Sequence, residues 1–461
     1  MNLVYGIHDK PKFPQLLIFA FQQVLAILAA TIAVPTIIGN GMSQSAALFG
    51  AGIGTLVYQL LTKYRSPVYL GSSFAFMGSM SAAFAGAASA AAGHAGLFIG
   101  VVFAGLVYVI IAMVIKFVGV NWLEKLLPPA VIGPTVAIIG LSLAKNAVGD
   151  LFTGKVLVES VELVVKDGGI VPNVSMVSAC DPFVALICGL VTLFAVMLIS
   201  VFGKKMMKLI PFVLGILVGY LVAAVFTVVG LVTDNVALQV IDFSVFTNME
   251  IFSVPRFTFL QAAEGLTQVD GAYIATLAVA YIPVAFVVFA EHIADHKNLS
   301  TVIGQDLLQE PGLHRTLLGD GLGSIAGAFF GGCPNTTYGE SVGCVAITRN
   351  ASVITITVAA LMCVVISFFG PFVTFLSSIP NCVMGGVCFA LYGFIAVSGL
   401  KMVQKVDLNQ SKNLFVVSVI LIAGIGGLTL TFGQITVTAV ACALVLGIVT
   451  NLLLGSSKEE E

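Results

Sequence analysis

Three long stretches of the sequence contain no charged side chain: residues 182–203, 209–232 and 352–383. A helix needs about 20 apolar residues to cross the hydrocarbon core of a bilayer, and each stretch is long enough to do so. Charged residues make up only 9% of the chain, whereas they make up about 25% of soluble domains. The sequence therefore predicts an all-α membrane protein that crosses the lipid bilayer several times.

Fourteen segments are expected to be membrane-embedded helices, and the third and tenth of them are too short to cross the bilayer alone. They lie near residues 15–38, 44–62, 70–83, 95–115, 129–148, 182–203, 209–231, 271–294, 315–331, 340–349, 352–376, 382–400, 411–430 and 434–454. Because each half of the chain would hold seven spans, an odd number, the two halves would enter the membrane in opposite orientations. Inverted repeats of this kind are common among transporters.

The basic residues predict how these spans are oriented. Lys and Arg concentrate in cytoplasmic loops. With the N-terminus inside, only Lys145, Lys155, Lys166 and Arg256 of the 20 basic residues lie on the outer side. Both termini are therefore expected in the cytoplasm, and the short polar start of the chain does not resemble a cleavable signal. The net charge of −2 argues against a nucleic-acid partner, and the eight cysteines, which form no CxxC motif, are interpreted as small core residues.

Two polar interruptions occupy equivalent positions in the two halves. Residues 69–76 read YLGSSFAF, residues 333–340 read CPNTTYGE, and each opens the short span of its half. Pro334 has no N–H and the neighbouring glycines disfavour helix, so extended backbone is expected here. At membrane depth such backbone must be buried in protein or line a cavity. Two facing segments, with the N-termini of the following half-helices, would suit a small polar, planar or anionic ligand.

Two acids are expected inside the membrane, where an ionisable residue is a candidate for a functional site. Glu291 follows a long uncharged run, and Glu340 follows the second extended segment directly. Each has a structural alternative. Glu291 would be an acid bonded to Gln22 or Gln23 of the first span, and Glu340 would be a carboxylate favoured by the dipole of the helix that it opens.

Asp295 lies one helical turn after Glu291, on the same face of the helix. It reads equally well as a solvated acid near the cytoplasmic end and as a proton relay. Acids this close in a low-dielectric site cannot all be ionised at low cost, so at least one is expected to hold a proton. His292 is interpreted as a packing or interfacial residue. No role is predicted for three residues read as inner-loop or helix-end positions: Asp320, His296 and His314.

Several motifs resemble the nucleobase–ascorbate transporter family, in particular its bacterial uracil permeases. They are YLGSSFAF (69–76), FAEHIADH (289–296), DLLQEPGLHRTLLGDGLGSIAGAFFGG (306–332) and NTTYGESVGCVAITR (335–349), and the resemblance covers essentially the whole chain. The signature of the family is an acid or glutamine followed by Asn-x-Gly and, further on, Thr near a basic residue. Here it starts at Glu340 and ends at Thr348-Arg349. Ser341 stands where Asn is usual, and Gln22-Gln23 stands where Gln-His is typical.

This resemblance implies a fourteen-span fold of two inverted seven-span repeats, with short antiparallel strands before spans 3 and 10. A core domain would comprise residues 1–128 (spans 1–4) and 270–379 (spans 8–11). A gate domain would comprise residues 129–269 (spans 5–7 and an outer loop) and 380–461 (spans 12–14 and a cytoplasmic tail). The resemblance also implies a bacterial inner (plasma) membrane location and suggests a homodimer formed through the gate domain.

The resemblance further implies that a nucleobase binds in the core domain between the two strands. Glu291 would bond the ring, Glu340 would complete its recognition, and backbone amides at Phe74 and Gly339 would contact it. The remaining substrate-binding residues would be Ala30, Ser73, Tyr338 and Tyr392. Uracil alternates C=O acceptors with N–H donors, so a carboxylate and backbone N–H groups match its edge.

The combined expectation is a proton-coupled symporter that imports a nucleobase by alternating access, with uracil as the expected substrate. The proton gradient would supply the energy, and no cofactor or metal is expected. Proton coupling would involve Glu340 as the carrier, Glu291, and Asp295 as an accessory relay. The alternatives are a purine (xanthine or uric acid) symporter of the same family and a passive channel for small polar solutes. An enzyme is not expected, because no nucleophile and base form a recognisable pattern.

Overall fold

The computed structural model describes residues 3–119, 122, 126–166, 169–204, 207–208, 210–247, 249–432 and 435–455, and most of them are helical. The chain forms two compact units, each made of separate stretches of sequence. The first unit comprises Met1–Leu143, Phe252–Phe369 and Tyr392–Glu461, and the second comprises Ala144–Ile251 and Gly370–Leu391. These units group residues by their contacts, whereas the predicted core and gate domains are parts that move. The core and gate boundaries therefore stay a prediction.

The first unit holds most of the helices and two pairs of short strands. Its elements are α1 (Phe13–Ile38), α2 (Gln44–Leu61), β1 (Leu70–Ser72), α3 (Met77–Ala85), α4 (Ala90–Val118), α6 (Pro129–Ser142), α10 (Thr258–Ala263), α11 (Gly271–Ile303), α12 (Leu313–Gly331), β4 (Asn335–Thr337), α13 (Gly339–Thr348), α14 (Val353–Ile366), α17 (Ser411–Ile425), β5 (Leu430–Phe432), β6 (Ile435–Val437) and α18 (Ala439–Gly455). Helix α16 (Asn381–Val403) belongs to the second unit up to Leu391 and to the first unit from Tyr392 onward.

The second unit contains two long apolar helices and a long hairpin. Its elements are α7 (Ala144–Asp150), β2 (Leu157–Lys166), β3 (Gly169–Ser178), α8 (Pro182–Phe202), α9 (Pro211–Val232) and α15 (Gly370–Ser378). Strands β2 and β3 pair antiparallel, from Leu157 opposite Ser178 to Lys166 opposite Gly169. The sequence predicts only an outer loop in this region, so the hairpin is an addition to the expected fold.

Seven helical segments in the described part of the chain are long and apolar enough to cross a membrane. They are α1, α4, the combined segment Pro129–Asp150, α8, α9, α11 and α16, and α14, α17 and α18 are shorter apolar helices. The protein is therefore a mostly helical membrane protein with many crossings. The count of fourteen spans and their orientation stay predictions. Three of the basic residues assigned to the inner side, Lys125, Lys205 and Lys458, lie outside the described residues.

Several of the expected helices have other bounds in the structure. The helix expected at 70–83 is β1 followed by α3, the one at 129–148 is divided into α6 and α7, and the one at 411–430 stops at Ile425. Two further differences have a clear physical reason. Helix α11 continues to Ile303 through the polar residues that follow Glu291 and stops at Gly304, which has a left-handed backbone (φ 73°). Polar side chains do not end a helix, whereas a glycine at this position does. The predicted helix 352–376 is interrupted at residues 367–369, between α14 and α15. A Cβ atom on Gly370, the first residue of α15, would lie 1.7 Å from the carbonyl oxygen of Glu250. Only glycine allows that close approach.

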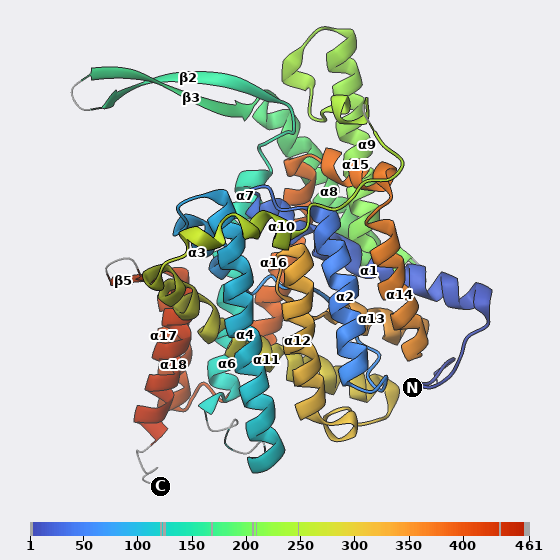
Figure 1. Cartoon of the computed structure of the whole chain (residues 1–461), viewed down its shortest axis with the longest axis vertical. Helices are drawn as coiled ribbons and strands as arrows, with labels where there is room; N and C mark the ends of the chain where they lie inside the picture. Colours follow the sequence, from blue (N-terminus) through green and yellow to red (C-terminus); the bar gives the residue numbers. More distant parts are fainter. Residues whose placement is uncertain are drawn as a thin grey trace. The chain divides into compact units, whose positions relative to one another are not determined.

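Helix α12 lies between α2 and α4 and holds the centre of the first unit together (Figure 1). Small residues bring the backbones of α2 and α12 into contact. A Cβ atom on Gly50 would lie 2.4 Å from the carbonyl oxygen of Gly327, and one on Gly54 would lie 2.6 Å from that of Gly323. Close packing through glycine is typical of helix pairs in membranes. This packing fixes the position of α12, which is directly followed by the second extended segment, residues 333–340.

The two polar interruptions form a pair of strands. Strand β1 pairs antiparallel with β4, with Leu70 opposite Thr337, Gly71 opposite Thr336 and Ser72 opposite Asn335. Helix α12 ends because Gly332 adopts a left-handed backbone (φ 75°), and Pro334 follows. All six strand residues are buried, so this extended backbone lies inside the protein, as membrane depth requires.

Candidate functional site

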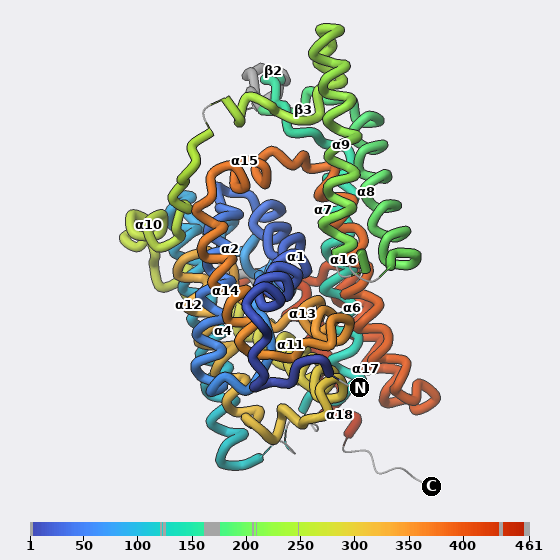
Figure 2. Tube along the Cα trace, turned by 90° about the vertical axis from the view of Figure 1, so that its right-hand side faces the viewer, coloured from blue at the N-terminus to red at the C-terminus, as the bar shows by residue number. Residues whose placement is uncertain are grey.

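The antiparallel pair of β1 (Leu70–Ser72) and β4 (Asn335–Thr337) is called the crossing below. Its strands lead toward short helices, β1 toward α3 and β4 toward α13. Helix α13 packs between α1 and α11, as Figure 2 shows. Asn335 fixes β4 to the helices behind it, since its backbone N–H donates to Ser324 Oγ (2.9 Å) and its Nδ2 donates to the carbonyl oxygen of Gly50 (3.1 Å). The crossing is therefore a rigid support for the residues next to it.

Apolar and aromatic side chains lie on one side of the crossing. Ala30 and Tyr338 belong to one buried cluster, and the half-buried Phe74 packs against it. The ring of Tyr392 meets the ring of Phe74 edge to face, with centroids 5.8 Å apart. Aromatic pairs prefer this geometry. Four residues predicted to contact a ligand are thus brought together by α1, the segments after β1 and β4, and α16.

Tyr338 and Ser73 are almost completely enclosed by protein. The Tyr338 hydroxyl donates to the carbonyl oxygen of Ser72 (2.7 Å), and a Cβ atom on Gly71 would lie 2.5 Å from the Tyr338 ring. The backbone N–H of Ser73 donates to the carbonyl oxygen of Pro334 (2.8 Å). Its buried Oγ has no hydrogen-bond partner among the described residues. Tyr338 thus supports the crossing through its side chain, and Ser73 supports it through its backbone.

Exposed surface at the crossing belongs instead to Phe74, Gly339, Glu291 and Glu340. The two glutamates are half-buried, and Gly339 is exposed. A Cβ atom on Gly339 would meet only Asp295 Oδ1, at 3.9 Å. The backbone at the start of α13 is therefore open to a small molecule, and both glutamates lie beside it within range of each other's charge.

The three predicted acids come from two elements of the structure. Glu291 and Asp295 lie one turn apart on α11, and Glu340 lies in the first turn of α13. Asp295 Oδ2 accepts a hydrogen bond from Thr337 Oγ1 (2.8 Å), which connects α11 to β4. Neither glutamate has a hydrogen bond to another side chain in the described part of the chain, so both are available to a ligand. The position of Glu340 also suits the helix dipole.

Among the described residues, no hydrogen bond joins Gln22 or Gln23 of α1 to Glu291, which was the structural alternative considered for that acid. Gln23 Nε2 donates to Ser341 Oγ, and Ser341 Oγ also accepts from the backbone N–H of Tyr69 (3.2 Å). Gln22 Oε1 is buried and has no hydrogen-bond partner in the described residues. The two departures from the family pattern thus contact each other, and this contact holds α13 against α1.

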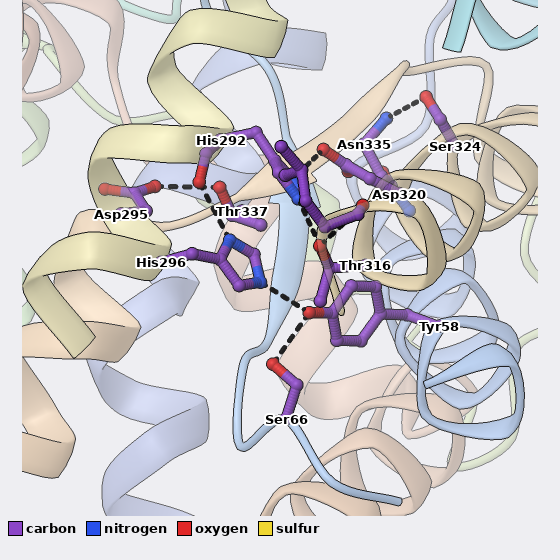
Figure 3. A network of polar contacts seen from close by, with 11 residues as sticks. Tyr58, Ser66, His292, Asp295, His296, Thr316, Asp320, Ser324, Asn335 and Thr337 are labelled. Carbon is purple, nitrogen blue, oxygen red and sulfur yellow. Dashed lines mark hydrogen bonds and ion pairs between the residues drawn. The ribbon is translucent and has the colours of Figure 1, made fainter. Parts of the chain in front are cut away.

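A buried polar network lies next to the acids and was missed from the sequence (Figure 3). His292 Nδ1 is 2.8 Å from Asp320 Oδ2, and His292 Nε2 is 3.0 Å from Thr316 Oγ1. His296 Nε2 is 2.7 Å from the hydroxyl of Tyr58. The expectation that Asp320 and His296 lie in inner loops or at helix ends is wrong. Both are fully buried, in the bodies of α12 and α11.

One sequence signal pointed to this network. Thr316 and Asp320 are four residues apart, as are His292 and His296, so each pair presents its side chains on one helical face. Asp320 lies between small residues in LLGDGLGS, where a solvated acid at a helix end would be expected beside other polar residues. Buried acids are almost always paired. A search for a partner would have led to the histidines.

The sequence model of a "Permease family" matches residues 14–433 of the chain. The chain belongs to this family. The permease is 38% identical to a protein named "Uracil permease" from Bacillus caldolyticus over 454 residues, which cover 98% of this chain and 94% of the relative. It is 37% identical to the "Uracil permease" of Bacillus subtilis (strain 168), over 99% of this chain and 96% of that relative.

A solved structure has a similar fold. The transmembrane domain of a cyanobacterial bicarbonate transporter, BicA, superposes on the permease with a TM-score of 0.59. The match covers 97% of this chain and 100% of the other, at 14% identity. At that identity the likeness shows the fold alone. The family match shows that the permease is a membrane transporter and not an enzyme.

Proposed function

We propose that this permease imports uracil together with protons by alternating access. The observation that carries the proposal is the pair of half-buried glutamates, Glu291 and Glu340, beside the open backbone of Gly339. Two relatives that match almost the whole chain bear the name uracil permease. A small planar ligand with alternating donors and acceptors suits a site of carboxylates, backbone amides and aromatic edges.

In this proposal Glu291 accepts a hydrogen bond from a ring N–H, and backbone N–H groups at Phe74 and Gly339 donate to ring carbonyls. Glu340 completes the recognition of the ring edge. Hydrogen bonds to ionised acceptors are about twice as strong as neutral ones. The edge-to-face pair of Phe74 and Tyr392 limits the thickness of the ligand, whereas Ala30, Ser73 and Tyr338 shape the site from behind.

Proton coupling is proposed from the number of acids at the site. Glu291, Asp295 and Glu340 lie within range of one another's charges. At least one of them must hold a proton, because three carboxylates in a low-dielectric site repel one another strongly. Glu340 is the proposed carrier, since Glu291 must be ionised to accept from the base. Asp295, bonded to Thr337, is the proposed accessory relay toward the cytoplasm.

The finer architecture is part of the same proposal. Fourteen spans would form two inverted repeats, and the core and gate domains would move against each other around the site. Both termini would lie in the cytoplasm of a bacterium, with the permease in its plasma membrane as a homodimer through the gate domain. The pairing of β1 with β4, one interruption from each half, supports this arrangement.

Uptake by proteoliposomes tests the proposed function. With an acidic exterior, radiolabelled uracil is expected to accumulate above its external concentration. Excess unlabelled uracil should compete, excess xanthine should not, and a protonophore should abolish the accumulation. Competition by xanthine would instead favour the purine alternative. Uptake that never exceeds the external concentration, with or without the proton gradient, would indicate a channel.

Gly339→Val is expected to lower uracil binding about tenfold or more, which corresponds to about 1.4 kcal/mol. The added side chain finds no protein atom closer than Asp295 Oδ1 at 3.9 Å, so the fold should accept it. The same branched side chain would occupy the space through which a ligand approaches the backbone. Equilibrium binding to the purified variant measures the effect.

Gly271→Val is the matched control for this substitution. Gly271 is also the first residue of a helix, α11, and a Cβ atom there meets no atom within 4 Å. The control should bind uracil like the unmodified protein. Equal affinity of the Gly339 and Gly271 variants would argue against recognition through the backbone of α13.

A further inference from the structure

His292 and Asp320 form a contact that is fully enclosed by protein. Both side chains are 0% exposed, and His292 Nδ1 lies 2.8 Å from Asp320 Oδ2. His292 directly follows Glu291 on α11, whereas Asp320 and Thr316 lie one turn apart on α12. The imidazole is therefore held at both nitrogens by a single face of α12, as Figure 3 shows. This contact fixes the rotation of α11 and with it the direction of Glu291.

The hydrogen bonds define where the protons of His292 lie. The Thr316 hydroxyl donates to the carbonyl oxygen of Leu313 (3.1 Å), so its oxygen accepts from His292 Nε2–H (3.0 Å). Nε2 is therefore protonated. One further proton occupies the contact between His292 Nδ1 and Asp320 Oδ2, either on the nitrogen as an ion pair or on the oxygen as a neutral pair.

The other oxygen of Asp320 makes the ionised form costly. Asp320 Oδ1 is buried without a hydrogen-bond partner among the described residues. A buried carboxylate with an unsatisfied oxygen is disfavoured, whereas a carbonyl oxygen in that place costs much less. The geometry therefore favours the neutral pair, with the shared proton on Asp320 and a neutral His292.

A second histidine extends the network. His296 Nδ1 donates to the carbonyl oxygen of His292 (2.8 Å), so its Nε2 is free to accept from the Tyr58 hydroxyl (2.7 Å). The single hydroxyl hydrogen of Tyr58 serves either His296 or Ser66 Oγ, which is 2.8 Å away. The rings of His292 and His296 lie with centroids 4.1 Å apart. Two imidazolium ions so close would repel, so at most one of them is charged.

Charges on every packed element act on this pair. The titratable groups that interact with it are Glu291, Asp295 and His296 on α11, Tyr58 on α2 and Tyr108 on α4. Glu340 on α13 interacts in turn with Glu291 and Asp295. The groups that become negative near neutral pH are all acids of the proposed site. With its shared proton the His292–Asp320 pair has no net charge, and loss of that proton adds a negative charge beside these acids.

We propose that His292 and Asp320 are a positioning pair that holds one exchangeable proton. Because the pair joins α11 to α12, this proton links the protonation of the acids in the proposed site to the contact between these two helices. The pair does not contact the substrate. This inference rests on the proposed function, because it adds a second proton site to the proposed coupling. It predicts that uracil binding depends on this proton as well as on those of the site acids.

Asp320→Asn tests the pair. The amide keeps the shape and donates from Nδ2 to His292 Nδ1, which reproduces the neutral pair permanently without an exchangeable proton. Affinity for uracil is expected to remain within about threefold at low pH. The loss of affinity on raising the pH should be shallower, by up to one proton in the slope of log Kd against pH. Calorimetry in two buffers of different ionisation enthalpy should show a smaller proton exchange on binding.

A profile of Asp320→Asn that superposes on that of the unmodified protein would overturn the inference and leave only a structural contact. Uphill uptake by the unmodified protein tests the coupling separately. If that uptake does not depend on the proton gradient, the proposed proton coupling is wrong. The dependence of uracil binding by Asp320→Asn on pH then still tests whether the His292–Asp320 pair holds an exchangeable proton.

Thr316→Val covers the case that the Asn variant does not fold. Without the acceptor for Nε2–H, the pair loses its shared proton more readily, because the imidazole can then keep its remaining proton on Nδ1. The pH at which affinity falls should therefore decrease by about one unit. Thr316→Ser keeps the hydroxyl and should restore the original profile. Equal profiles for the Val and Ser variants would contradict the proposal.

Discussion

Glu291→Gln is expected to lower uracil binding about a hundredfold while leaving the protein folded. The substitution replaces an acceptor with two equivalent oxygens by an amide that can turn a donor toward the ring N–H. Loss of a hydrogen bond to a charged group costs about 1.5–3 kcal/mol, and facing donors add repulsion. The fold should survive, because no side chain in the described part of the chain depends on Glu291 for a hydrogen bond.

Equilibrium binding and thermal unfolding of the purified variant measure the two expectations together. Glu264→Gln is a suitable control, since Glu264 is an exposed glutamate just after α10. Its binding should be unchanged. Normal uracil uptake by Glu291→Gln, with the control also normal, would remove Glu291 from the site.

Glu340→Gln is expected to retain part of the binding but to lose uphill accumulation and its dependence on external pH. Glutamine has the size of a protonated glutamate and can still form hydrogen bonds with the ring edge, but it cannot release a proton on the inner side. Accumulation should therefore fall to the level that a protonophore leaves in the unmodified protein. Uptake at several external pH values, each with and without protonophore, measures this loss.

The helix dipole provides a second explanation that must be separated from this one. A carboxylate in the first turn of a helix stabilises it by about 0.3–1 kcal/mol, so the Gln variant should also unfold slightly earlier. Glu340→Asp keeps the charge and should keep some pH-dependent accumulation. If Glu340→Gln still concentrates uracil and the protonophore still abolishes this, the proton is carried elsewhere. Asp295 is then the first residue to examine.

The membrane class and the helix positions followed from the sequence because burial in lipid imposes long apolar runs. The interruptions at 69–76 and 333–340 were found for the same reason, since Pro334 and clustered glycines are conspicuous inside such runs. Their pairing in β1 and β4 required the structure. The family resemblance supplied the expected roles of Ala30 and Tyr392, whose side chains carry no chemical signal of their own.

The histidine network was not predicted, because its members are far apart along the chain and each looks ordinary alone. Asp320 acquires meaning only from His292 across the α11–α12 contact. The hairpin of β2 and β3 was missed for a different reason. Its strands satisfy their hydrogen bonds with each other, and the charged residues in this region are typical of an outer loop as well as of an exposed hairpin.

The strand crossing also has a consequence for the biosynthesis of the protein. Tyr338 and Ser72, which are hydrogen-bonded at the crossing, are 266 residues apart in the chain. The segment Leu70–Ser72 is therefore synthesised and inserted long before β4 exists, with backbone groups that lipid cannot satisfy. Until then it must stay hydrated or be sheltered by the insertion machinery. A nascent chain released before Asn335 would hold the membrane helices up to α12 but would lack half of the proposed binding site.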